Sequence, residues 1–222
     1  MMSTPGAVPD RQRRTFSTAR LEAFSDGVFA IAITLLILNV VEATGGSPLA
    51  AFLNAWPSYV GYVVSFLTIG VAWIGHAALT DDLDHVDSVF LRLNLLLLLV
   101  VVFLPFPTSL VTAAFGDSVA ERVAVTVYGV TLLCIRLIGI ALDHYSAHEH
   151  LYARDRDETE LVRTRRKNTL GVILYAVAIV VGLLLPGVAV TFYFAIAVYL
   201  VVPFREVTRL VRSRHSGQVP TT

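Results

Sequence analysis

Four polar side chains lie inside apolar stretches of the sequence. They are Asp26 in "FSDGVFAIA", His76 in "WIGHAAL", Asn94 in "LRLNLLLLL" and Arg136 in "LLCIRLIGI". A carboxylate and an imidazole can carry protons, and both can also join helices by hydrogen bonds, as an amide can. Inside a bilayer each polar group costs free energy unless it is paired or hydrated. We therefore expect either proton transfer or interhelical hydrogen bonding at these positions.

Each of these residues also has a simpler structural interpretation. Asp26 can be a helix-start residue, because a carboxylate in a first turn favours the positive end of the helix dipole. His76 and Asn94 are typical of single interhelical hydrogen bonds. Arg136 must pair or reach the membrane surface, and Asp143 is a candidate partner. A lone arginine does not make a voltage sensor.

Enzyme and metal signatures are missing from the sequence. It contains no H-E-x-x-H, G-x-S-x-G or P-loop motif and no Cys/His cluster with metal spacing. The histidines of "DHYSAHEH" are expected to belong to a hydrated juxtamembrane loop. The T-V-G-Y-G potassium filter is absent as well. We therefore predict no catalytic residue, no metal site and no cofactor.

The composition places these residues in a membrane protein. Of the 222 residues, 55% are hydrophobic and 15% are charged, whereas soluble domains carry about 25% charged residues. A bilayer core needs about 20 mainly apolar residues per helix. The chain is thus predicted to be an all-α polytopic membrane protein with six transmembrane helices. The expected segments are Phe24–Val41, Phe52–Leu79, Phe90–Ala114 (broken by "PFP"), Val119–Leu142, Leu170–Leu185 and Val188–Phe204. The last two are short and joined by a tight turn at "PG". They could form a re-entrant pair instead, and we favour two true spans.

The basic residues predict the orientation of these helices. Fourteen of the seventeen Lys and Arg residues precede the first span, lie between spans four and five, or follow the last span. The positive-inside rule then places both termini in the cytoplasm of a multi-pass protein in the cell membrane. Residues 1–19 and 205–222 are predicted to be basic cytoplasmic tails around a transmembrane domain at 20–204. The formal net charge is zero, which gives no indication of nucleic acid as a partner.

The first helix has two chemically different faces. At about 100° per residue, Ser25 and Asp26 lie roughly 120–140° away from Ile31, whereas Leu35 and Leu38 lie within roughly 40° of it. One face is therefore aliphatic, and the opposite face begins with a hydroxyl and a carboxylate. The polar face is expected to dock onto neighbouring helices, and the aliphatic face must meet lipid, another helix or a pore.

The spacing R-x-x-x-F-S-D at Arg20–Asp26, followed by "GVFAIAITLLIL", resembles the signature of the transmembrane protein 175 family. These are the endolysosomal potassium channels and their bacterial relatives. Animal members carry two six-helix repeats, whereas "FSD" occurs once here, as in the bacterial members. The resemblance implies a homotetramer whose first helices line a central pore in the lipid bilayer.

The resemblance also implies roles for individual residues. The positions that would form the pore and its narrowest rings are Ile31, Leu35 and Leu38, with the hydroxyl of Thr34 nearby. The signature residues Arg20, Phe24, Ser25 and Asp26 would anchor the first helix, through Trp73, His76 and Asn94 on the next two helices.

These implications lead to one leading function and two alternatives. We expect a potassium-preferring cation channel, with potassium as the permeant ion, closed by rings of aliphatic side chains. The alternative is a proton channel or ion-coupled transporter that uses Asp26 and His76 as titrating groups. A non-conducting membrane scaffold is the third possibility.

Overall fold

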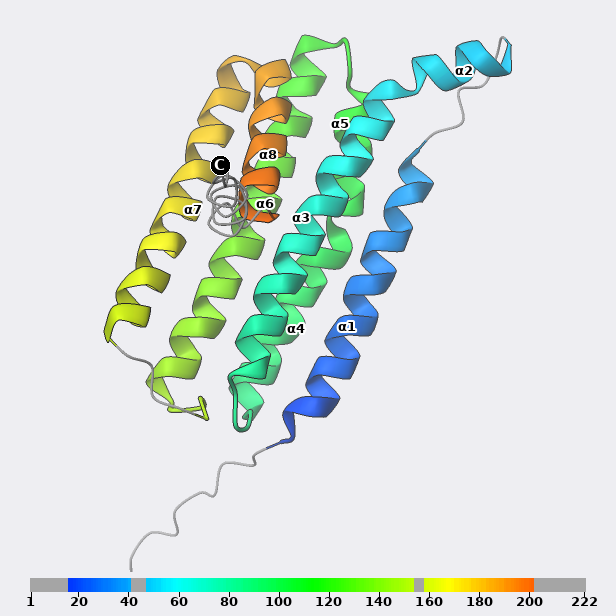
Figure 1. Ribbon diagram of the computed structural model, residues 1–222. Helices are drawn as coiled ribbons and strands as arrows, with labels where there is room; N and C mark the ends of the chain where they lie inside the picture. Colours follow the sequence, from blue (N-terminus) through cyan, green and yellow to red (C-terminus); the bar gives the residue numbers. More distant parts are fainter. Residues whose placement is uncertain (1–15, 41–46, 154–157, 202–222) are drawn as a thin grey trace, which may run out of the picture.

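The computed structural model describes residues 16–40, 47–153 and 158–201, and these residues form a bundle of α-helices (Figure 1). The elements are α1 (Thr18–Leu35), the 3₁₀ turn η1 (Leu36–Asn39), α2 (Pro48–Asn54), α3 (Trp56–Asp81), α4 (Ser88–Phe103), α5 (Pro105–Ala113), α6 (Ser118–His148), α7 (Glu158–Leu184) and α8 (Pro186–Val201). The predicted tails at 1–19 and 205–222 lie almost wholly outside the described residues.

The protein is an all-α polytopic membrane protein. Within the described residues, five helical segments are long and apolar enough to cross a bilayer: Thr18–Asn39, Trp56–Asp81, Ser88–Ala113, Ser118–His148 and Val162–Leu184. They correspond to the first five predicted spans. The last predicted span is represented by α8, a shorter apolar helix that packs against α3, α6 and α7.

Two predicted spans differ in detail from the helices observed. The stretch predicted at Phe52–Leu79 is split, because α2 ends before Ala55 and α3 starts at Trp56 with Pro57 in its first turn. Proline suits the start of a helix and not its interior. In Figure 1, α2 therefore leaves the bundle as a separate short helix. The fifth span was predicted too short, since α7 begins twelve residues before Leu170, at Glu158.

Other helix boundaries follow from local chemistry. Pro105 stands at the first position of α5, and the "PFP" sequence divides the third span at Leu104, as predicted. Asp87 and Asp117 cap α4 and α6, each accepting two backbone N–H groups with its side chain. The residues of "PG" open α8 rather than lying between two helices.

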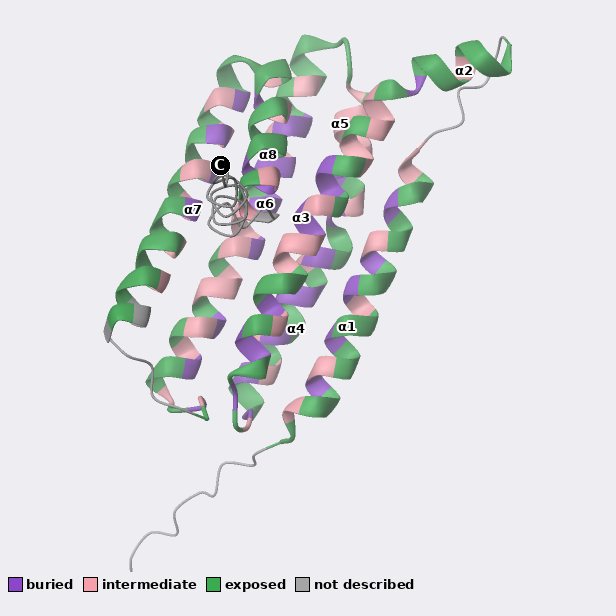
Figure 2. Ribbon diagram, viewed as in Figure 1, coloured by how far each residue is buried: buried purple, intermediate pink, exposed green. Residues whose placement is uncertain are grey.

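The core runs along the middle of the bundle. Helices α3 and α6 contact most of the others, α1 packs against α3 and α4, and α7 packs against α6 and α8. Buried residues line the facing sides of these helices, and exposed apolar residues cover the outside (Figure 2). An apolar exterior is what a bilayer or a neighbouring subunit requires.

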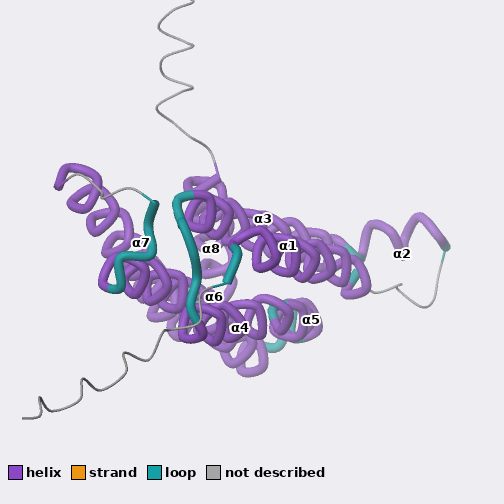
Figure 3. Tube along the Cα trace, turned by 90° about the horizontal axis from the view of Figure 1, so that it is seen from below, coloured by secondary structure: helices purple, strands orange, loops and turns teal. Residues whose placement is uncertain are grey.

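One end of the bundle holds the starts of α1 and α7 and the ends of α3 and α6, and we refer to it as the basic end (Figures 1 and 3). Isolated bridges tie Phe16 to Val86 and Leu83 to Tyr152 there. In the acidic segment Thr80–Asp87, Asp87 is buried and also accepts a hydrogen bond of 2.6 Å from the hydroxyl of Tyr145.

Candidate functional site

Helix α1 buries a narrow face against α3 and α4. Its buried residues are Leu21, Ser25, Phe29 and Ala32, and Leu36 continues the series in η1. Spacings of three and four residues place all five on one side of a helix. Four of these side chains are apolar, so the single hydroxyl among them, Ser25, needs a partner.

Ser25 belongs to a buried hydrogen-bond chain that joins three helices. The amide nitrogen Nδ2 of Asn94 on α4 donates to Ser25 Oγ at 3.0 Å, and Asn94 Oδ1 lies 2.8 Å from His76 Nε2 on α3. Because Oδ1 can only accept, His76 donates from Nε2. Each of the three residues is at most 4% exposed. Each of the three residues therefore has a hydrogen-bond partner, and the chain fixes the positions of α1, α3 and α4 relative to one another.

Asp26 lies beside this chain and anchors α1 from its flank. The indole Nε1 of Trp73 on α3 donates to Asp26 Oδ1 at 2.8 Å. Both residues are partly exposed in the single subunit. This contact joins α1 to α3 a second time, one residue away from Ser25 in the buried chain.

A second anchor holds the far end of the same helix. Asn39, in η1, donates from Nδ2 to the backbone oxygen of Pro105 at 2.9 Å. The carbonyl of Pro105 is close to the break between α4 and α5, where helix geometry changes. Sequence reasoning missed Asn39, although an amide directly after the run "LLIL" was a visible signal. Helix α1 is thus fastened near both ends.

Between these anchors an aliphatic stripe on α1 is not covered by the subunit's own helices. Ile31 is 56% exposed, Leu35 is 37% exposed and Leu38 is 74% exposed. Leu35 ends α1 and Leu38 lies in the 3₁₀ turn, where residues three apart eclipse each other. The change of helix type therefore keeps Leu38 directly over Leu35, and the stripe stays straight.

Thr34 borders the stripe, and its hydroxyl is already engaged. Thr34 is exposed, and its Oγ1 donates to the backbone oxygen of Ile31 at 2.9 Å. The hydroxyl oxygen keeps its capacity to accept a hydrogen bond or to face a cation. Ile33, on the other side of α1, is half-buried and packs against the core. The uncovered face is thus confined to one side of the helix.

Two signature residues stand apart from the anchor network. Phe24 is 55% exposed and Arg20 is exposed, both on α1. Within the described part of the chain, neither residue joins the contacts of Asp26, Trp73, His76 and Asn94 by a hydrogen bond.

The hydrogen bonds of Arg136 go to α7 and not to Asp143, the partner considered for it. Its Nη2 donates to Asn168 Oδ1 at 2.8 Å and to the backbone oxygen of Lys167 at 3.2 Å, both on α7. Asp143 instead accepts a hydrogen bond of 2.7 Å from the hydroxyl of Tyr152. The seven-residue spacing put Asp143 on the same side of α6, but it could not show that α7 lies closer to the guanidinium.

The chain is similar in sequence to known membrane channels. Residues 20–105 match the family model described as the endosomal/lysosomal potassium channel TMEM175. A potassium channel of Streptomyces collinus is 40% identical over 73% of this chain and 81% of its own length. The endosomal/lysosomal proton channel TMEM175 of Gallus gallus is 37% identical to this chain over a matched region. That region is 46% of this chain and 22% of the longer relative.

A solved structure shares the architecture. The crystal structure of a lysosomal potassium-selective channel TMEM175 homolog from Chamaesiphon minutus superposes with a TM-score of 0.74 and 33% sequence identity. The match covers 82% of this chain and 95% of that one.

Proposed function

The chain belongs to the TMEM175 family of membrane channels, and on that premise we propose that it is a potassium-preferring cation channel. Relatives described as potassium channels or as potassium-selective support the ion assignment. The observation that carries the proposal is the exposed aliphatic stripe of Ile31, Leu35 and Leu38 on a helix anchored at both ends.

We propose that four copies of the chain place α1 around a central axis. The exposed stripe then faces the axis, and each of its residues forms a ring of four side chains. The anchors at Ser25 and Asp26 and at Asn39 hold the helix so that these rings stack along the pore. In this arrangement the face that a single subunit leaves uncovered becomes the pore wall.

Rings of Ile and Leu give a definite kind of gate. Aliphatic side chains offer no ligand to a hydrated cation, and a narrow apolar constriction tends to lose its water. An ion must therefore shed part of its hydration shell to pass. Potassium is held less tightly by water than the smaller sodium ion is, so the barrier is lower for potassium. Selectivity of this origin is modest, and polar substitution in the rings should weaken it.

The proposed setting is the cell membrane, with six spans and both termini in the cytoplasm. Here α8 is the sixth span and the basic end faces the cytoplasm. The arginines and the lysine in the first turns of α7, at 163–167, favour that side by the positive-inside rule.

One observation favours a second candidate, conduction of protons. His76 and Asp26 are titratable, and His76 lines a cavity between α3, α6 and α7. The TMEM175 relative of Gallus gallus is described as a proton channel. In this alternative a proton would move by way of His76, whose Nε2 is engaged with Asn94.

Flux measurements on the purified full chain in liposomes separate these functions. Under the potassium proposal, a potassium gradient drives a flux larger than an equal sodium gradient does. A pH gradient alone drives none, and His76→Gln keeps the potassium flux of any protein that assembles. A proton flux that His76→Gln abolishes, without potassium flux in the wild type, supports the alternative. No flux of any of these ions refutes both.

A further inference from the structure

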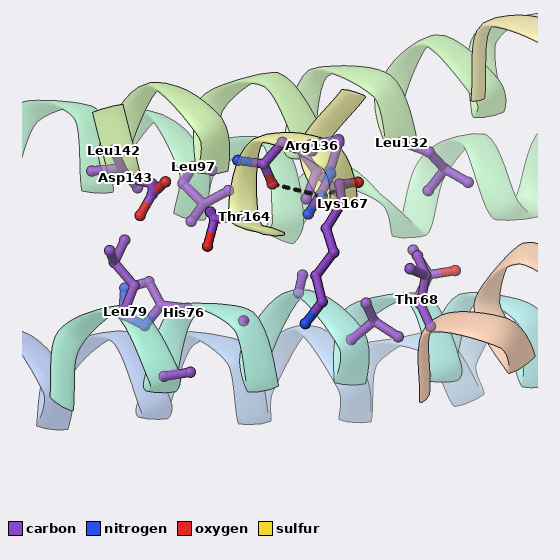
Figure 4. A pocket seen from close by; sticks show the side chains of 18 of the residues that line it. Thr68, His76, Leu79, Leu97, Leu132, Arg136, Leu142, Asp143, Thr164 and Lys167 are labelled. Atoms are coloured by element: carbon purple, nitrogen blue, oxygen red, sulfur yellow. Dashed lines mark hydrogen bonds between the residues drawn. The ribbon is translucent and has the colours of Figure 1, made fainter. Parts of the chain in front are cut away.

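A cavity of about 360 Å³ lies between α3, α6 and α7 on the side of the basic end (Figure 4). Its wall is built mainly from α3, α6 and α7, and Leu200 of α8 also lines it.

Two cations reach into this cavity. Arg136 is held by Asn168 and the Lys167 backbone, and its buried Nε has no hydrogen-bond partner. Gly171 fixes this packing, because a Cβ there would lie 2.8 Å from Arg136 Nε. The side chain of Lys167 extends across the cavity from α7 (Figure 4). Neither cation forms an ion pair within the described residues, so both can hold an anion.

The lengths of α6 and α7 place both cations near the level of lipid headgroups. Arg136 is 18 residues from the start of α6 and Lys167 is 17 residues from the end of α7. At 1.5 Å per residue, Arg136 lies about 27 Å and Lys167 about 26 Å from the helix ends that are farther from the basic end. The hydrocarbon core is about 30 Å thick. The guanidinium and the ammonium therefore lie near the inner edge of the leaflet at the basic end.

Carboxylates line the same cavity closer to the basic end. Asp143 follows Arg136 by seven residues on α6, about 10 Å along the axis, and Asp82 follows the last turn of α3. In Figure 4 the side chain of Asp143 points into the cavity from a position away from Arg136 and Lys167. Asp143 accepts a hydrogen bond from Tyr152, and a carboxylate accepts several such bonds. Positive charge thus lies deeper and negative charge lies nearer water.

We propose that this cavity binds a phospholipid with a primary-amine headgroup, of the phosphatidylethanolamine class. The phosphate lies against Lys167 and Arg136, with the Thr164 hydroxyl as a further donor. The ammonium, which lies on the water side of the phosphate in such a lipid, points to Asp143 and Asp82. The apolar residues of α3 and α6 in the cavity wall accommodate the start of an acyl chain. An anionic lipid matches only the cations, and a choline headgroup has no N–H to give to the carboxylates.

Native mass spectrometry of the purified full chain with added lipids tests this. The probes are phosphatidylethanolamine, phosphatidylglycerol and phosphatidylcholine with the same acyl chains. We expect phosphatidylethanolamine to be retained over the other two. Lys167→Gln should weaken its retention about tenfold, as for the loss of one hydrogen bond to a charged group. Arg166→Gln is the matched control, because it removes an equal charge one residue away, outside the cavity, and should change nothing.

A second variant tests the amine end separately. Asp143→Asn should lower the preference for phosphatidylethanolamine over phosphatidylglycerol while leaving phosphatidylglycerol retention unchanged or higher. Equal retention of all three lipids, or wild-type retention by Lys167→Gln, overturns the proposal. Displacement of the lipid by millimolar inorganic phosphate also overturns it, because the site then binds a small anion.

Discussion

Replacement of Asn94 by leucine should loosen the attachment of α1 more than any other single change in the hydrogen-bond network. Leucine has nearly the shape of asparagine, so the packing of α4 is retained. The change removes the bonds of 3.0 Å to Ser25 and 2.8 Å to His76, and leaves both partners unpaired at 0% and 4% exposure. An unpaired buried polar group costs about 1–3 kcal/mol, so the two groups together would cost about 2–6 kcal/mol in a soluble protein.

The membrane setting reduces that figure. Interhelical hydrogen bonds in membrane proteins average about 0.6 kcal/mol and reach about 1.7 kcal/mol, because the unfolded chain in the membrane also finds partners. Two bonds together should therefore contribute about 1–3 kcal/mol to stability. Unfolding in a mixed-detergent titration measures this value. Asn54→Leu, the same exchange at an exposed position of α2, should stay within about 0.5 kcal/mol of the wild type.

A double-mutant cycle with Ser25→Ala isolates the Ser25–Asn94 bond. The effects of the two changes on stability should be less than additive, because each one removes the same contact. Full additivity, or an Asn94→Leu protein as stable as the Asn54→Leu control, would show that this chain of three residues does not fasten α1.

Three further predictions concern the bundle. Trp73→Phe removes the 2.8 Å hydrogen bond to Asp26 and should lower the fraction of assembled protein in size-exclusion chromatography. The assembled fraction should keep its ion preference. A changed preference would count against an anchoring role for this contact. Gly129→Ala should lower the melting temperature, because the added methyl would lie 2.7 Å from a side-chain carbon of α7 and overpacking costs about 1–3 kcal/mol. In a background without the native cysteine, Ser47→Cys and Ala147→Cys, both exposed, should react with impermeant thiol reagents from opposite sides of the membrane, and labelling from one side would contradict the proposed topology.

Much of the fold could be predicted because apolar length and helix-breaking residues are local signals. The third span breaks at "PFP", where proline opens α5. Helix ends were less predictable. Helix α7 begins at Glu158, in a charged stretch that is too polar for a membrane span. This stretch is nevertheless helical and extends α7 beyond its apolar segment. The start of α3 was also missed, because Pro57 was treated as part of one long span.

The candidate site was predictable only in part. Periodicity placed Ser25 opposite the aliphatic stripe of Ile31, and the structure buries Ser25 while it leaves Ile31 exposed. The partner of Arg136 was not predictable, since the spacing within α6 carries no information on how close α7 comes. The role of Asn39 depends likewise on a long-range contact, with the carbonyl of Pro105, 66 residues away. Contacts of this kind require the tertiary arrangement.

The most direct test of the central proposal is the potassium-to-sodium permeability ratio of Ile31→Asn, measured from reversal potentials in planar bilayers. An amide ring lets water bridge the constriction and replaces part of each ion's hydration shell. We expect a larger conductance and a ratio closer to one. Ile33→Asn, at a half-buried position packed on the core, should instead reduce assembly without changing the ratio. An assembled Ile31→Asn channel with the wild-type ratio would contradict the aliphatic filter.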